Sequence, residues 1–267
     1  MGKTFLRLQV SHAARLTGLG RVLLLLLGGA SLSTCGPGHG EDCLTSTGPV
    51  VTERRELPAG LLSVYANDNV DLILVQEATA TAAPYAEVRT GKNLIADIET
   101  RVEGNQLQLS NTARCNWARS YDTPREVTLH VPAIKNVFLH GTGNVSTAGQ
   151  FRQDTIFFHL TGAGDMNLDV QSNYLWMDLY ELGDETVRGS ADQLILTQGG
   201  NGRFFGQDLR TRVSYLHTNR DSNGDTYLQV TGFLGASIRG NGTVYYSGHP
   251  GGTDIQVFGH GQAQPVP

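Results

Sequence analysis

The chain has 267 residues, of which 33 are glycine and 17% are charged, and its formal net charge is −5. It contains no long charge run and no low-complexity tract, so the composition indicates a folded protein. Loss of the first 34 residues, which carry four basic residues and no acidic one, would leave 16 basic residues against 25 acidic ones, a net charge of −9. This charge excludes nucleic acid as an expected partner.

The first 34 residues have the pattern of an export signal. A basic start precedes the apolar run VLLLLLGGA at residues 22–30, which is too short to span a bilayer. The next residues, LSTC, end at Cys35 and resemble the lipobox of bacterial lipoproteins. That resemblance implies cleavage before Cys35 and a lipid on its sulfur; a plain signal peptide or a misplaced start codon are the alternatives. We therefore expect a signal peptide (1–34), a linker (35–48) and one domain (49–267).

Two more cysteines, Cys43 and Cys115, belong to the exported part of the chain. A cysteine pair in an oxidising compartment is expected to oxidise, and we predict a disulfide that ties the N-terminal segment to the domain. A metal site is the weaker alternative because no CxxC or HxxxH spacing accompanies these cysteines.

Residues 49–132 show the period of β-strands. Apolar and polar residues alternate in three stretches, at residues 70–76, 94–110 and 126–141. No segment of the domain has a capped helical stripe, so we predict an all-β protein.

From residue 133 to 262 the chain returns to glycine at short intervals. The anchors are Gly141, Gly162, Gly183, Gly200, Gly240 and Gly259. The residues four positions before them are apolar, namely Val137, Phe158, Leu179, Leu196, Ala236 and Ile255. Four positions after the anchors stand Val145, Met166, Val187, Phe204 and Val244.

A repeat of this kind predicts a parallel β-helix with coils of about twenty residues, on which the N-terminal strands pack or which they continue. A β-sandwich or barrel is the alternative. We attribute the recurrent glycine to a tight corner with positive φ. Residues 210–232 fit the repeat only if the turn NRDSNGD is longer than the others.

The ordered series NVDLILVQ, NLIADIETRVEGNQLQLS, Cys115, VTLHVPAIKNVFLHGTGNV, LTGAGDMNLDV and IRGNGTVYYSGHP resembles the head GIN domain family. These are auto-transporter adhesin heads, formerly a domain of unknown function, found largely as exported lipoproteins of Bacteroidota. The resemblance covers nearly the whole exported chain and implies a right-handed β-helix at the cell envelope without established enzymatic activity.

Catalytic and metal sites find little support in the sequence. Two pairs of acids, Asp165 with Asp169 and Asp178 with Asp184, could converge, but acids near turns usually cap them. The turn residues Asp221, Asn223 and Asp225 faintly resemble a calcium loop and lack its distal glutamate. We expect no cofactor, no metal and no enzymatic activity.

Strand alternation predicts an outward row of rings. Phe138, His159 and Tyr180 stand three residues before the first three anchors, and Phe157 and Trp176 occupy other outward positions. Stacked coils would place the first three side by side. Contiguous outward aromatics suit sugar faces or an apolar partner surface, unless the N-terminal strands or a second copy cover them.

We expect a module lipid-anchored to the bacterial outer membrane, on its periplasmic or cell-surface face, that binds glycans or envelope proteins as adhesins do. The alternatives are a carbohydrate-active β-helix enzyme, a lyase or hydrolase, and a purely structural envelope protein. The sequence leaves the oligomeric state open.

Overall fold

The computed structural model describes residues 46–113 and 122–267, and every regular element in these ranges is a β-strand. Cys35, Cys43 and Cys115 lie outside the described residues, so lipidation and the disulfide stay predictions. The described part of the chain holds no helix of the length and apolarity that a bilayer span requires. The strands are β1 (Val50–Glu56), β2 (Ser63–Ala66), β3 (Asp71–Gln76), β4 (Tyr85–Gly91), β5 (Ile98–Glu103), β6 (Gln106–Asn111), β7 (Glu126–Val131), β8 (Asn136–Leu139), β9 (Val145–Thr147), β10 (Phe151–Arg152), β11 (Thr155–Gly162), β12 (Met166–Glu181), β13 (Glu185–Gln198), β14 (Phe204–Thr218), β15 (Thr226–Ile238), β16 (Thr243–Ser247), β17 (Gly252–Val257) and β18 (Gln262–Pro265).

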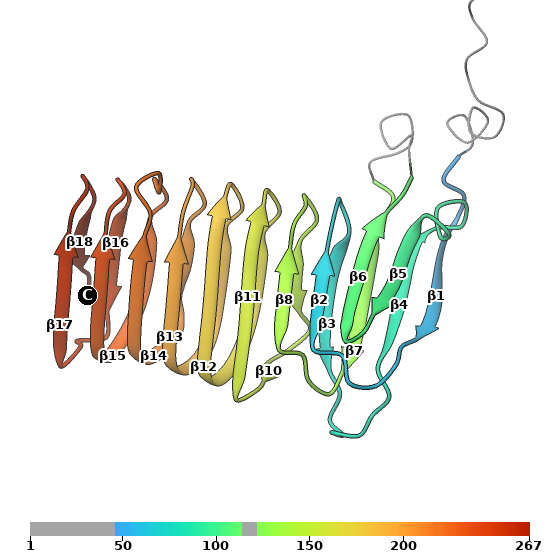
Figure 1. Ribbon diagram of the computed structural model, residues 1–267, viewed down its shortest axis with the longest axis horizontal. Helices are drawn as coiled ribbons and strands as arrows, with labels where there is room; N and C mark the ends of the chain where they lie inside the picture. The colour runs from blue at the N-terminus through green and yellow to red at the C-terminus, as the bar shows by residue number, and fades with distance from the viewer. Residues whose placement is uncertain (1–45, 114–121) are drawn as a thin grey trace, which may run out of the picture. The chain divides into compact units, whose positions relative to one another are not determined.

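Each coil of residues 136–265 contributes one strand segment to each of two faces. Face A consists of β6, β2, β8, β11, the second halves of β12 to β15, and β17, all paired in parallel. Face B holds β7, β3, β9 and β10, the first halves of β12 to β15, β16 and β18. A glycine-rich corner joins the faces at one side of the coil, and a bend within the long strands β12 to β15 joins them at the other (Figure 1). The fold is the predicted all-β solenoid, a parallel β-helix with coils of about twenty residues.

The coils at the N-terminal end do not follow the order of the sequence. The β2–β3 coil lies between the β6–β7 coil and the β8–β9 coil, with parallel pairing on both sides. Beyond β6 and β7 the pairing becomes antiparallel, through β5 and β4, and β1 then pairs with β4. The N-terminal strands therefore continue the β-helix and cover its end, where an open parallel edge would invite pairing with another chain.

The apolar columns predicted on either side of the glycine anchors form the core. Every residue of both columns is buried except Ile255, which lies partly buried in β17 and packs against the core. Inward and outward residues alternate almost without exception along β11, from Thr155 to Gly162. The alternation that predicted strands is thus the alternation that builds the core.

The predicted register is wrong at the third anchor. Backbone capping bonds between neighbouring coils span 21 residues at Asp165 but only 19 residues at Asp184. Because the coil shortens by two residues, Gly183 stacks on Gly164 and not on Gly162. A register shift by an even number of residues leaves inward-pointing side chains pointing inward. The column aligned on Gly183 therefore still consists of apolar residues, although they are not the true neighbours.

The corner glycines are needed for close approach of stacked backbones. A Cβ on any of Gly164, Gly183, Gly202, Gly224 or Gly242 would overlap the carbonyl oxygen of the glycine one coil earlier. Of the six anchors only Gly200 has a positive φ, at 78°. The expectation that the corner recruits glycine for its left-handed backbone is therefore wrong for the other five, since steric overlap between coils is the reason.

Because of the register shift, the glycine alignment of the sequence did not reveal a carboxyl group in the core. Glu185 is fully buried between Met166 and Phe204 of the adjacent coils, at the position that the glycine alignment gave to Val187. Neither carboxyl oxygen has a hydrogen-bond partner among the described residues. Burial, with a smaller contribution from the charge of Asp178, raises the pKa of Glu185 well above its usual value of 4.5. Glu185 therefore keeps its proton at pH values where a solvated glutamate is ionised.

Gly164→Ala is expected to destabilise the domain by at least about 2 kcal/mol, because the new methyl group must displace the backbone of the neighbouring coil. The free energy of unfolding in urea measures the effect. Gly251→Ala is the matched control, since its Cβ would meet no atom closer than 3.4 Å and its φ is not in the left-handed region. Equal stability of the two variants would contradict the steric account.

Glu185→Gln is expected to raise the melting temperature at pH 7.5 and to leave it nearly unchanged at pH 4. The folded state holds a proton that the unfolded state releases above the usual glutamate pKa of 4.5, so the wild type loses about 1.4 kcal/mol of stability per pH unit between that value and the folded pKa. The amide removes this loss. Melting curves across the pH range test it against Glu99→Gln, an exposed control; parallel curves for wild type and Glu185→Gln would refute it.

Candidate binding surface

The five residues predicted to bind a partner lie on the outer side of face A. They are carried by β8, β11 and β12, and all are half-buried; each lies between buried neighbours except Tyr180, which Glu181 follows at the exposed end of β12. Strands spaced about 4.8 Å apart bring their rings against one another. A sixth residue from β2 joins them, and we call the group the aromatic surface: Tyr65, Phe138, Phe157, His159, Trp176 and Tyr180.

One column of this surface is a stack of parallel rings. The ring centroids of Tyr65 and Phe138 are 4.3 Å apart with planes inclined by 4°, and those of Phe138 and His159 are 4.5 Å apart at 12°. Both faces of Phe138 are therefore covered, and only its edge remains for a partner. The N-terminal strand β2 does not bury the surface but adds a row to it. Tyr65 precedes Phe138 by 73 residues and its register was not visible in the glycine spacing.

Tyr180 does not belong to this column. The shorter coil places Asp178 beside His159 and Tyr180 beside Thr161. The ring of Tyr180 lies instead over the glycine corner, where a Cβ on Gly199 would touch it. The predicted ladder of Phe138, His159 and Tyr180 is therefore wrong at its third position, for the same reason as the register at Gly183.

Asp178 links the stacked column to Trp176, which belongs to a second column of outward side chains. Its Oδ2 lies 2.8 Å from Nδ1 of His159, and its Oδ1 accepts a hydrogen bond of 2.7 Å from Nε1 of Trp176. Burial alone would raise the pKa of Asp178, but the hydrogen bonds from His159 and Trp176 lower it below 3.8. Burial, and the charge of Asp178, raise the pKa of Tyr180. The surface thus contains one ionised carboxylate that fixes the indole and imidazole rings.

The second column is open. Phe157, Trp176, Ile195 and Tyr215 occupy corresponding positions of successive coils. The rings of Phe157 and Trp176 are tilted by 37° with centroids 5.9 Å apart, so they do not cover each other as the first column does. Tyr215 is 44% exposed and makes a tilted contact of 6.0 Å with Phe233. The sequence pattern did not single out Ile195, Tyr215 and Phe233. Their positions in the outward series of alternating strand residues could have indicated them.

Lys135 adds a positive charge beside this column, with its Nζ 5.6 Å from the ring centroid of Phe157. His140 lies near the first column, 5.7 Å from both Tyr65 and Phe138, and burial, with the charge of His159, lowers its pKa below 6.5. Aromatic faces flanked by an amine, an imidazole and a carboxylate are suited to a partner that is apolar on one side and hydroxylated at its rim.

The acids that might have formed catalytic pairs have separate partners. The Oδ1 of Asp165 accepts the backbone N–H of Asp184 at 2.9 Å, and the Oδ1 of Asp184 accepts the backbone N–H of Arg203 at 2.8 Å. Asp169 pairs with Arg188 at 3.0 Å. These side chains cap the next coil, as acids near turns commonly do.

The calcium-loop resemblance falls in the longer turn, which spans residues 219–225 between β14 and β15. Asn223 is part of an amide ladder, since it donates to Asn201 at 2.8 Å and accepts from Asn241 at 2.7 Å. The Oδ1 of Asp225 accepts the backbone N–H of Thr243 at 2.8 Å, and Asp221 is exposed. The described residues contain no group of three histidine, cysteine or acidic side chains placed to hold a metal ion.

Solved structures share this architecture. A "putative adhesin" from Bacteroides fragilis is 18% identical, with a TM-score of 0.73 over 82% of this chain and 97% of its own. A "putative lipid binding protein" from Parabacteroides distasonis is also 18% identical, with a TM-score of 0.63 over 82% and 98% of the two chains. A "putative adhesin" from Parabacteroides merdae, 16% identical, has a TM-score of 0.57 over 83% and 98%. No curated protein matches the chain significantly.

The sequence itself matches the profile of one protein family, described as "Putative auto-transporter adhesin, head GIN domain", over residues 63–250. The matched range runs from the start of β2 to the turn before β17, and so includes the aromatic surface and all but the last coil. The chain belongs to the head GIN domain family.

Proposed function

We propose that this protein is a binding module of the adhesin type that engages glycans through the open column of the aromatic surface and has no catalytic role. The observation that carries the proposal is the tilted pair Phe157 and Trp176, in which neither ring covers the face of the other. Sugar rings pack their C–H faces on aromatic rings and donate or accept hydrogen bonds at their edges. Lys135 and the carboxylate of Asp178 stand beside the pair.

The family description and the adhesin names of the structural relatives support a role in contact with external partners.

We propose further that Cys35 is lipidated after removal of residues 1–34 and anchors the domain to the bacterial outer membrane, on its periplasmic or cell-surface face. A disulfide between Cys43 and Cys115 would tie the anchor segment to the domain. If no glycan binds in the test below, that result would indicate a protein partner on the same aromatic surface.

A Phe157→Ala, Trp176→Ala variant is expected to lose at least about tenfold in affinity for any glycan that the wild type binds, because both aromatic rings of the pair disappear. A glycan array identifies the ligand and isothermal titration calorimetry measures the loss. Tyr245→Ala is the control, since Tyr245 stacks on Tyr227 on face B, 4.9 Å between centroids. Binding that survives in the double variant, or that is lost equally in Tyr245→Ala, would contradict the proposed surface.

Cys35→Ser is expected to move the protein from the membrane fraction to the soluble fraction and to abolish incorporation of labelled palmitate, because a serine hydroxyl does not take the lipid that the thiol takes. Cys43→Ser serves as the control and should remain in the membrane fraction. Continued membrane recovery of Cys35→Ser would exclude a lipid anchor at that residue.

A further inference from the structure

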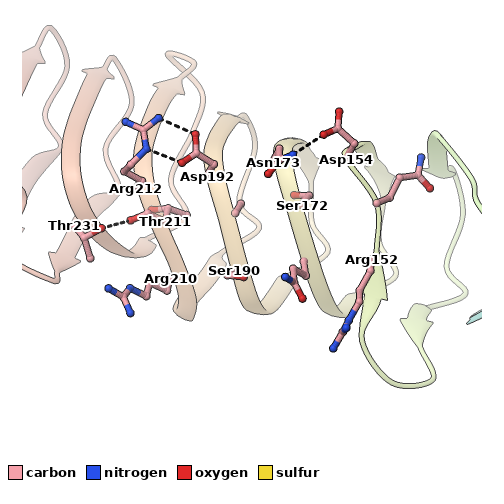
Figure 2. Close-up of a pocket in the computed structure, with 13 residues that line it drawn as sticks. Arg152, Asp154, Ser172, Asn173, Ser190, Asp192, Arg210, Thr211, Arg212 and Thr231 are labelled. Carbon is pink, nitrogen blue, oxygen red and sulfur yellow. Dashed lines mark hydrogen bonds and ion pairs between the residues drawn. The ribbon is translucent and has the colours of Figure 1, made fainter.

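A polar groove runs along the corner where the long strands bend. It has a volume of about 640 Å³ and is open to solvent. Residues from β10 and the turn after it, from the bends of β12, β13 and β14, and Thr231 of β15 line it, so it crosses five successive coils (Figure 2). The groove is separate from the aromatic surface, none of whose residues lines it.

Small side chains make the hollow. Ser172, Ala191 and Thr211 occupy the bend of three successive coils and are all buried. Thr211 is engaged, because its hydroxyl lies 2.8 Å from the carbonyl oxygen of Gln229. Ser172 is only 9% exposed, and its hydroxyl has no hydrogen-bond partner among the described residues. A buried hydroxyl without a partner carries a desolvation cost that a ligand can relieve.

One rim of the groove is basic at both ends and neutral between. Arg152, Gln171, Ser190 and Arg210 stand at corresponding positions of four coils, so the backbones of the two arginines are three strand spacings, about 14 Å, apart along the groove. Neither arginine forms an ion pair within the described residues, but the Nε of Arg152 donates a hydrogen bond of 3.0 Å to Oε1 of Gln150, which leaves its two terminal amino groups for a ligand. The side chains of Gln171 and Ser190 make no hydrogen bond within the described residues. Figure 2 shows the guanidinium groups of Arg152 and Arg210 directed away from the ion pair of the opposite rim.

On the opposite rim one of the two aspartates, Asp192, is neutralised by an arginine. Asp192 forms a bidentate ion pair with Arg212, with distances of 2.6 and 2.7 Å, and Asp154 accepts a hydrogen bond of 2.6 Å from Asn173. Three arginines and two aspartates line the groove, so its net charge is +1 in a chain of net charge −5. The groove is thus a basic strip on an acidic protein, which favours an anionic ligand.

We propose that this groove binds an acidic oligosaccharide whose carboxylates meet Arg152 and Arg210 and whose hydroxyl groups meet Gln171, Ser190 and Ser172. Planar guanidinium groups match carboxylates with two parallel hydrogen bonds. The spacing of the two arginines requires an extended ligand with separated charges, because one compact anion cannot reach both. The neutral side chains between them match a stretch of hydroxyl groups.

The probe is a hexamer of galacturonic acid, with its methyl-esterified form as the neutral counterpart, titrated into the purified full chain in a neutral detergent. The charged hexamer is expected to bind, more weakly as salt rises, and the ester at least about tenfold more weakly. Arg152→Gln combined with Arg210→Gln is expected to lower the affinity at least about tenfold. Arg220→Gln, an exposed arginine outside the groove, should bind as the wild type does.

Ser190→Phe fills the groove without changing its charge and should also abolish binding. Four results would overturn the proposal: no binding of the charged hexamer, equal binding of the ester, unchanged affinity of the double arginine variant, or tighter binding of tripolyphosphate, a compact anion. The Phe157→Ala, Trp176→Ala variant should keep the affinity for the hexamer, which separates a failure of this groove from a failure of the aromatic surface.

Discussion

The spacing of parallel strands is the constraint on which the rest of this domain depends. Neighbouring coils lie about 4.8 Å apart, and at the corner their backbones turn toward each other until no Cβ fits between them. A Cβ on Gly164 or Gly183 would clash with the carbonyl oxygen of a glycine in the preceding coil. The core is more permissive, because Met166 and Phe204 can occupy the same inward column. Stacking of the coils therefore requires glycine at the corner, whereas the core requires only inward side chains that fill the space.

The same spacing makes ladders on the outer surface. Like side chains that recur once per coil meet each other, as Tyr65 and Phe138 do by stacking and Asn201 and Asn223 do by amide hydrogen bonds. A side chain in a complete ladder has its interactions satisfied and adds rigidity. Groups that interrupt a ladder are the ones that remain available, and Trp176 interrupts the ring stacking of its column. Chemistry on such a scaffold is therefore to be sought where the repeat breaks.

The fold was predictable from local pattern because inward and outward alternation survives small errors of register. The coil that shortens from 21 to 19 residues shifted the alignment by an even number of residues. Leu179 was therefore as apolar as the residue that actually occupies that core position. The same shift hid the buried Glu185 and misplaced Tyr180. Tyr65 was out of reach for another reason, because its partner in the stack lies 73 residues away and no repeat connects them. Site geometry depends on exact register, which alternation does not fix.

The aromatic surface and the polar groove share their strands. β12 carries both Trp176 of the aromatic surface and Ser172 of the groove, and β13 carries both Ile195, which continues the open column, and Ser190 of the groove. Because each strand is hydrogen-bonded to the coils on both sides, the two surfaces are held in a fixed relation without a hinge. The two proposed sites on one rigid support would strengthen each other through effective concentration when a single chain reaches both, with no change of conformation. A repetitive polysaccharide would gain from this arrangement, and an isolated monosaccharide would not.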